Sequence, residues 1–397
     1  MLFTLALAAA EKKVVTPAGG PPPVGPYSPG IIAGEYFYVS GQGAAKADGT
    51  FPSTPEEQVL QCLANVRRIV EAAGLTMDHV VYAQVYMKDL GSGEDLNRAW
   101  TKVFPSNPPA RAILGVARMP TDTPVEITVV AVRDIGRKIA IRPPGTPMNS
   151  PIAPGMMTGD RMYVSTLPGR DPKTGQIPSD PAQQVQFALN AMGEVLKTAG
   201  MDFQNMAFVN PYHTDKMPAN VMNTEYAKHF EFGNTPARAT IRVASLPEGA
   251  SIVFTGVAVR ELSRRSAVRP KNMSPSATAS PCVWAVDTFY CSAKSGFIPG
   301  PNGGVYGSTV ETQMRQTMRN LLDGLEEAGL TFANVVATNV YLDDINEFTR
   351  MNKIYAEYFS GAPPTRTTIQ QVPSVERKAD ARDRWPTLEQ VSLIAVR

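Results

Sequence analysis

Few side chains in this chain of 397 residues have types and spacings that could do chemistry. The three histidines, His79, His213 and His229, show no metal-ligand spacing, and the three cysteines form no Cys-x-x-Cys pair. No metal site is therefore predicted, and each histidine is interpreted as an ordinary surface or core residue. Ser40 has no histidine or aspartate in its motif, so a serine nucleophile is not expected. An arginine that recurs at nearly constant spacing is the remaining candidate.

This arginine belongs to an internal repeat of the whole sequence. Arg111, Arg238 and Arg366 follow Pro-Pro-Ala, Thr-Pro-Ala and Pro-Pro-Thr, and each copy closes with Ala-Val-Arg. A repeat of this length is a complete domain rather than one turn of a solenoid. The boundaries are expected in the proline- and arginine-bearing stretches 135–147 and 263–275. The predicted domains are a tail of residues 1–13, then residues 14–137, 138–264 and 265–397.

The tail contains the one strongly apolar run of the chain, Leu2 to Ala10. It is too short to cross a bilayer, so no membrane span is expected. Its small residues Ala8-Ala9-Ala10 before Glu11 are typical of a signal-peptide cleavage site, but a basic stretch at the start is missing. A residual signal segment and an ordinary N-terminal tail therefore both stay open.

Composition narrows the class of protein. Hydrophobic residues make up 43% of the chain and charged residues 19%, which excludes global disorder. Lys plus Arg total 38 against 36 Asp plus Glu, a net charge of +2. Strong non-specific nucleic-acid binding needs a basic excess, so no nucleic-acid partner is expected.

The three repeats predict the same order of elements. In the first repeat, Thr54, Pro55 and Glu57 form a helix-start signal, and Gly74 is placed to end that helix. The full order is ββαβαββ, an α+β domain with a sheet on one side and two helices on the other. The expected elements are strands at 30–33 and 36–40, a helix ending at Gly74, a strand at 80–86, a helix near 95–104, and strands near 112–117 and 125–132.

Motifs in the first repeat resemble the RidA/YjgF family, also labelled endoribonuclease L-PSP. They are Val24-Gly25-Pro26-Tyr27-Ser28-Pro29, Tyr38-Val39-Ser40-Gly41-Gln42, Asn97, Pro109-Ala110-Arg111 and Val125-Glu126-Ile127. The later repeats carry weaker versions. The resemblance implies a chorismate-mutase-like fold, trimers with clefts between subunits, and hydrolysis of enamines and imines such as 2-aminoacrylate to 2-keto acids and ammonia without a cofactor. It also implies a cytoplasmic location, whereas a signal segment would imply a periplasmic or secreted one.

Three such units in one chain suggest a monomer that acts as an intramolecular pseudo-trimer. By resemblance, Arg111 would hold the substrate carboxylate and Glu126 would orient or deprotonate the attacking water. Tyr27, Ser40 and Asn97 would line the pocket by the same resemblance.

The later repeats lack part of this set. Counting back from each Ala-Val-Arg gives Val253 and Gln390 as the counterparts of Glu126, and Glu389 is offset to the opposite strand face. Both repeats also lack a counterpart of Tyr27. One complete site around Arg111 and Glu126 is therefore predicted, with two junctions that at most bind acids. The residues kept at those junctions are Ser165, Asn223 and Arg238, and Ser292, Asn352 and Arg366.

Simpler interpretations of these residues stay open. Arg111 could satisfy loop carbonyls, and Glu126, alternating with apolar neighbours, could face solvent from a strand. Asn97 begins a helical pattern that aromatic packing also explains. A non-catalytic binder of small carboxylates is the alternative function. An endoribonuclease ranks last, because no histidine pair is placed for phosphodiester chemistry.

Cys282 and Cys291 form a possible disulfide. If Val286-Asp287 turns the first hairpin of the third repeat, the two cysteines face each other across it. Such a bond would favour an oxidising compartment, and two buried thiols are the alternative.

Overall fold

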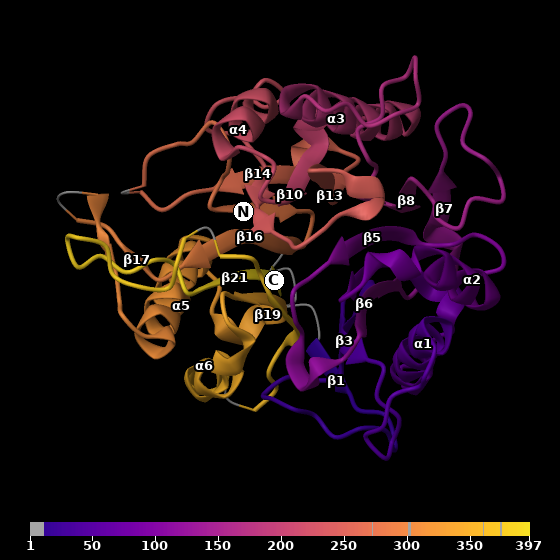
Figure 1. The fold of residues 1–397 in the computed structure, drawn as a ribbon, viewed down its shortest axis with the longest axis horizontal. Coiled ribbons are helices and arrows are strands. Elements are labelled where there is room, and N and C mark those ends of the chain that lie inside the picture. The colour runs from indigo at the N-terminus through magenta and orange to yellow at the C-terminus, as the bar shows by residue number, and fades with distance from the viewer. Residues whose placement is uncertain (1–11, 272, 301–302, 360, 374) are drawn as a thin grey trace, which may run out of the picture.

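Three copies of one α+β unit follow one another along the chain and meet around a common centre (Figure 1). The computed structural model describes residues 12–271, 273–300, 303–359, 361–373 and 375–397. The run Leu2 to Ala10, on which the signal-segment prediction rests, lies outside these residues. Within the described ranges, no helix is long and apolar enough to span a membrane.

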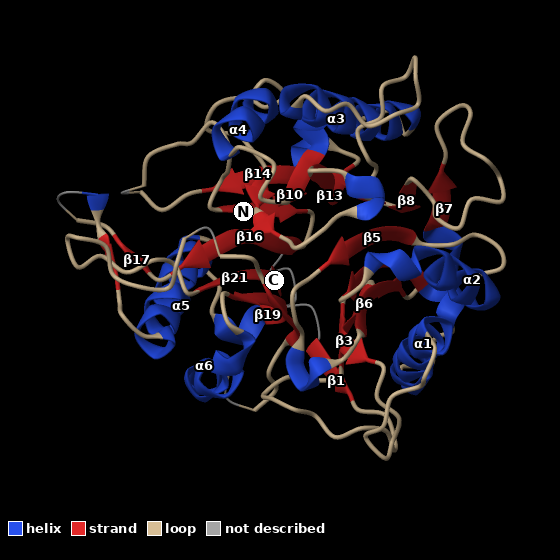
Figure 2. Cartoon of the chain, in the orientation of Figure 1, coloured by secondary structure: helices blue, strands red, loops and turns tan. Residues whose placement is uncertain are grey.

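The first repeat places two helices over one face of a six-stranded sheet (Figure 2). Its sheet has the order β1-β2-β3-β6-β4-β5, in which β4 and β5 run parallel. Thr54 and Glu57 form the predicted capping box, and Gly74 follows the helix with a φ of 76°. The elements are β1 (Lys12–Val15), β2 (Gly30–Ala33), β3 (Tyr36–Gly43), α1 (Pro55–Ala72), β4 (Val80–Met87), α2 (Gly93–Val103), β5 (Ala110–Gly115) and β6 (Val125–Val132).

The second and third repeats have the same architecture. In the second, the strand that matches β5 is divided into two short pieces. Its elements are β7 (Lys138–Ile141), β8 (Gly155–Thr158), β9 (Arg161–Val164), α3 (Pro181–Thr198), β10 (Met206–His213), α4 (Ala219–Ala227), β11 (Ala237–Arg238), β12 (Ile241–Arg242) and β13 (Ile252–Val259). The third contains β14 (Arg265–Val268), β15 (Cys282–Ala285), β16 (Thr288–Ser295), β17 (Phe297–Ile298), β18 (Val305–Tyr306), α5 (Val310–Glu327), β19 (Val335–Leu342), α6 (Phe348–Tyr355), β20 (Thr365–Gln370) and β21 (Glu389–Val396).

Each repeat begins with a strand that the sequence pattern does not predict. β1, β7 and β14 pair antiparallel with the hairpin that follows, so the order in the first repeat is βββαβαββ. The third repeat adds the short pair β17 and β18 before its first helix. β1 starts at Lys12, the first described residue, which lies inside the predicted tail. The Lys12 ammonium donates hydrogen bonds to the carbonyls of Val335 and Ala362 in the third repeat.

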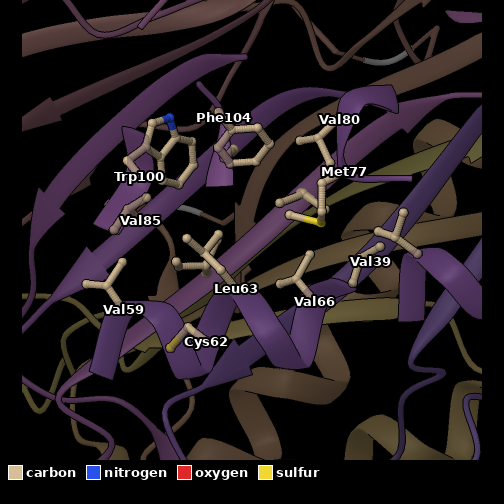
Figure 3. Packing of buried hydrophobic residues seen from close by; sticks show 14 of the residues in the cluster. Val39, Val59, Cys62, Leu63, Val66, Met77, Val80, Val85, Trp100 and Phe104 are labelled. Atoms are coloured by element: carbon tan, nitrogen blue, oxygen red, sulfur yellow. The ribbon is translucent and has the colours of Figure 1, made fainter. Parts of the chain in front are cut away.

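The two faces of each sheet have different partners. One face packs on the helices, where Val59, Leu63 and Val66 of α1 share one buried cluster with Val39 of β3 and Val85 of β4 (Figure 3). The other face points to the centre of the molecule, where one buried cluster contains residues of all three repeats. Burying this second face explains why the units associate, because a sheet left open to water would expose a large apolar surface.

One hydrogen-bonding unit recurs at all three junctions between repeats. The backbone N–H of Arg111 donates to Ser165 Oγ at 2.8 Å, and this hydroxyl donates to the carbonyl of Ala153 at 2.7 Å. Arg238 and Ser292 repeat the contact between the second and third repeats. The same contact joins the third repeat to the first, from the backbone N–H of Arg366 to Ser40 at 2.9 Å. The ring of repeats is therefore closed.

The first hairpin of the third repeat turns at Val286-Asp287, as the sequence predicts. Cys282 lies opposite Cys291, and a disulfide joins them. Val286 adopts a φ of 64°, which is unusual for a β-branched residue. Asp287 is held by an ion pair with Arg161 of the second repeat, so a contact between repeats helps to fix this turn.

We predict that Ser165→Ala lowers the free energy of unfolding by about 1–3 kcal/mol, because a buried N–H loses its acceptor. Urea unfolding of this variant, beside a Ser106→Ala control at an exposed loop position, measures the effect. Equal stability of the two variants would contradict a structural role for the junction serine.

Candidate functional site

A cleft of about 320 Å³ lies at the junction of the first and third repeats. We call it the Glu126 cleft. Glu126 comes from β6 and is 7% exposed. The side chains that share the cleft with it include Tyr27, Gln42, Phe51, Phe348, Arg366 and Thr368.

The arginine of this cleft is Arg366 and not Arg111, so the predicted pairing of Arg111 with Glu126 is wrong. Arg366 is on β20, which approaches β3 of the first repeat. Arg111 is on β5, at the far edge of the first sheet, and it contacts Ser165 of the second repeat. In the first sheet, β4 lies between the strands of Arg111 and Glu126, whereas the cleft is built from β3, β6 and the neighbouring repeat.

The three arginines differ in what their guanidinium groups bind. Arg111 Nη2 donates to Asn97 Oδ1 at 2.7 Å, and Arg238 Nη2 donates to Asn223 Oδ1 at 2.9 Å. The equivalent asparagine of the third repeat is Asn352. Both Nη atoms of Arg366 and Oδ1 of Asn352 are buried without a hydrogen-bond partner among the described residues. Arg366 is thus the arginine whose two Nη donors are both unused within the described ranges, whereas Arg111 leaves Nε and Nη1 without a partner there.

Arg366 is nevertheless firmly positioned. It is 4% exposed, and its guanidinium lies over the rings of Tyr355 at 4.9 Å and Phe348 at 5.3 Å. The guanidinium carbon also lies 5.4 Å from the centre of the Tyr27 ring, and the Tyr27 hydroxyl accepts the N–H of Val24. Three aromatic rings therefore hold a cation whose two Nη atoms have no hydrogen-bond partner among the described residues.

The Glu126 carboxylate lies against Gly41, in the space that a side chain at this position would take. A Cβ added at Gly41 would overlap Glu126 Oε1, so the carboxylate would have to move. At the matching position the other repeats have Thr166 and Ala293, beside Val253 and Gln390 in place of Glu126. Glycine and glutamate therefore occur together, as the close approach requires.

Burial raises the pKa of Glu126 to about 8, and the positive charge of Arg366 opposes this shift. A buried carboxyl prefers its neutral form, and here one nearby cation offsets the desolvation only in part. Glu126 can consequently hold or release a proton near neutral pH, which is the range that general acid–base chemistry needs.

Ser40 and Asn97 have other roles than the predicted lining of this cleft. The Ser40 hydroxyl donates to the carbonyl of Ser28 and accepts the N–H of Arg366, so it orients the arginine through the backbone. Asn97 lies on α2 at the junction of the first and second repeats, where it binds Arg111.

The junction of the first and second repeats holds Arg111 in apolar surroundings. Val253 replaces the carboxylate there and is buried. Arg111 is 3% exposed, lies over Trp100 at 4.7 Å, and has its pKa lowered to about 9 by burial. These contacts support the structural interpretation of Arg111.

Glu389 does not replace Glu126 in the third repeat. It is fully buried on the helix side of β21, where Thr317 of α5 donates a hydrogen bond to it. Burial raises the pKa of Glu389 to about 8. Within the described part of the chain, no group of His, Cys, Asp and Glu side chains could hold a metal ion.

The structure shows a protein of three repeated units with a cleft at the junction of the first and third, and sequence comparison gives its family. The family model described as "Endoribonuclease L-PSP" matches residues 19–133, 148–259 and 271–380. The chain belongs to this family, and the family's domain occurs in it three times.

Similar proteins are each as long as one repeat. A RutC family protein of Saccharolobus solfataricus is 38% identical over 30% of this chain and 97% of its own length. The 2-iminobutanoate/2-iminopropanoate deaminase of Escherichia coli strain K12 is 35% identical over 30% of this chain and 98% of its own length. Among solved structures, E. coli TdcF with bound serine is 31% identical, covering 31% of this chain and 99% of that one with a TM-score of 0.30.

We predict that Glu126→Gln is more stable than the wild type by an amount that grows as pH rises from about 5 to 8. The folded wild type keeps its proton up to a pKa of about 8, whereas the unfolded chain releases it near pH 4.5, so rising pH costs the wild type stability. The difference in free energy of unfolding should change by more than about 1 kcal/mol across this range. A difference that does not vary with pH would show that Glu126 has an ordinary pKa.

Proposed function

We propose that this protein is a hydrolytic deaminase of 2-imino acids and their enamine tautomers. The active site is the Glu126 cleft, and the ring of three repeats takes the place of a trimer of separate chains. The observation that supports this proposal is the presence, in one cleft, of a buried arginine with two unused donors among the described residues and a carboxyl with a raised pKa. The deaminase names of relatives at 35% identity agree with it.

The guanidinium of Arg366 would bind the substrate carboxylate through two parallel hydrogen bonds. This places the C2 carbon of the imino acid toward Glu126. The three rings around the arginine keep water from its faces, so the ion pair forms in a weakly screening environment.

Protonated Glu126 would give its proton to the imine nitrogen and become a carboxylate. The carboxylate would then take a proton from a water molecule as its oxygen bonds to C2, which forms a carbinolamine. Transfer of the hydroxyl proton to nitrogen breaks the C–N bond and releases ammonia and the 2-keto acid. One water is consumed and no oxidant or cofactor is required, while orientation and proton transfer supply the rate enhancement.

A binder of small carboxylates is the second candidate, because two further arginines, Arg111 and Arg238, lie at junctions where Val253 and Gln390 replace the carboxylate. It predicts arginine-dependent binding of keto acids while imine hydrolysis stays at the background rate.

We predict that Arg366→Met lowers kcat/KM by about 100-fold or more, because the substrate loses its bidentate anchor. The matched variant Arg111→Met should keep most of the activity if it folds, since Arg111 lies at another junction. The assay is ammonia and keto-acid release from 2-aminoacrylate generated in situ. Loss of activity in Arg111→Met with normal activity in Arg366→Met would reverse the assignment.

We predict that Gly41→Ala lowers kcat by about tenfold or more, because the new Cβ takes the place of the Glu126 carboxylate. Ala293→Gly at the junction of the second and third repeats is the control and should leave kcat unchanged. Steady-state kinetics and thermal unfolding of both variants separate a lost site from a lost fold. Normal kcat in a folded Gly41→Ala would contradict the placement of Glu126.

A further inference from the structure

The junction of the second and third repeats contains a second cavity, of about 380 Å³. We call it the Lys294 pocket. It is separate from the Glu126 cleft, and no part of the proposed deaminase reaction uses it. The residues that could bind a ligand there are Arg238, Thr240, Ser292, Lys294 and Gln390.

The Lys294 pocket is lined by two cations, whereas the Glu126 cleft is lined by one arginine and one carboxyl group. Lys294 occupies the position of Gln42, and Gln390 occupies the position of Glu126. Gln390 therefore places an amide where the Glu126 cleft has a carboxylate, and Lys294 places a cation where that cleft has the amide of Gln42. Arg238 and Lys294 both line the pocket, and none of its described lining residues is acidic.

Several polar atoms of the pocket have no partner among the described residues. Arg238 Nη1 and Thr240 Oγ1 are buried without a hydrogen bond. Burial lowers the pKa of Lys294, and the negative charge of Asp323 on α5 opposes this shift only in part. Asp323 itself pairs with Arg319 at 2.9 Å. Arg238 and Lys294 are both half-buried, and the charge of Lys294 is offset only in part by Asp323. An anion bound between the two cations would offset the remaining cost of their burial.

Two side chains near Lys294 also differ from their counterparts in the first repeat. Ala293 replaces Gly41, so its Cβ fills the space that the Glu126 carboxylate uses in the first repeat. Gln390 is turned to a different partner, because its amide nitrogen donates to Gln371 Oε1 at 2.9 Å. A carboxylate in the geometry of Glu126 would not fit here.

We propose that the Lys294 pocket binds a small molecule with two anionic groups, a carboxylate on Arg238 and a second anionic group on Lys294. A planar guanidinium suits a carboxylate, whereas an ammonium accepts either a second carboxylate or a phosphate as a point charge. Dicarboxylates and phosphorylated carboxylates share this chemistry.

The test measures binding to the full chain by isothermal titration calorimetry, with 2-oxobutanoate, 2-oxoglutarate and phosphoenolpyruvate as probes. All titrations use the Arg366→Met variant, in which the Glu126 cleft has lost its anchor. At least one of the two dianions should bind about tenfold or more tightly than the monoanion 2-oxobutanoate, and which of them does so distinguishes a dicarboxylate from a phosphate ligand.

Lys294→Gln, which introduces the residue type of the first repeat, should remove that preference, and Lys294→Arg should keep most of it. Deaminase activity, measured in chains that retain Arg366, should be the same in Lys294→Gln as in the wild type. Equal affinity for all three probes, or a preference that survives Lys294→Gln, would overturn the proposal. Thermal unfolding of each variant is also measured, so that a variant that does not fold is recognised directly. Absence of deaminase activity in the wild type, together with a dianion preference that Lys294→Gln removes, would count against the proposed function and not against this pocket.

Discussion

The hydrogen bond from an arginine N–H to a serine hydroxyl of the next repeat is the contact on which the arrangement of this molecule depends. It occurs at all three junctions, with distances of 2.8 Å for Arg111 and Arg238 and 2.9 Å for Arg366. The contact uses the backbone of the arginine, so the guanidinium stays available for another role. Closing the ring also buries the sheet faces that the helices do not cover. The backbone N–H of each arginine thus joins two repeats, while the guanidinium of the same residue can bind another group.

This separation explains how the three junctions came to differ while the ring was retained. The junction around Arg111 is apolar, with Asn97 taking one guanidinium nitrogen. The junction around Arg366 has the Gly41–Glu126 pair and an arginine whose donors are unused among the described residues. The junction around Arg238 carries a second cation. Because linked repeats need not stay identical, each junction can acquire its own ligand preference without loss of the assembly.

Most of the fold could be predicted from local signals. The Thr54–Glu57 capping box and the Gly74 helix end depend on neighbouring residues alone, and the structure contains both. The strand β1 could not be predicted in this way, because four residues at the edge of a sheet carry little periodic pattern.

The composition of the cleft was harder to predict, for a topological reason. Arg111 and Glu126 are close in sequence and belong to one motif set, but β5 lies at the edge of the sheet that meets the following repeat. Glu126 faces the preceding repeat in the ring, which for the first repeat is the last one. Sequence spacing within a repeat holds no information about which neighbour closes a junction, so the pairing with Arg366 required the three-dimensional arrangement.

The most direct test of this account is a crystal structure of the chain with bound 2-oxobutanoate, the keto acid that the proposed reaction would release. The account predicts its carboxylate on both Nη atoms of Arg366 and its C2 carbon facing Glu126. A keto acid held by Arg111, with Arg366 and Glu126 unoccupied, would contradict it.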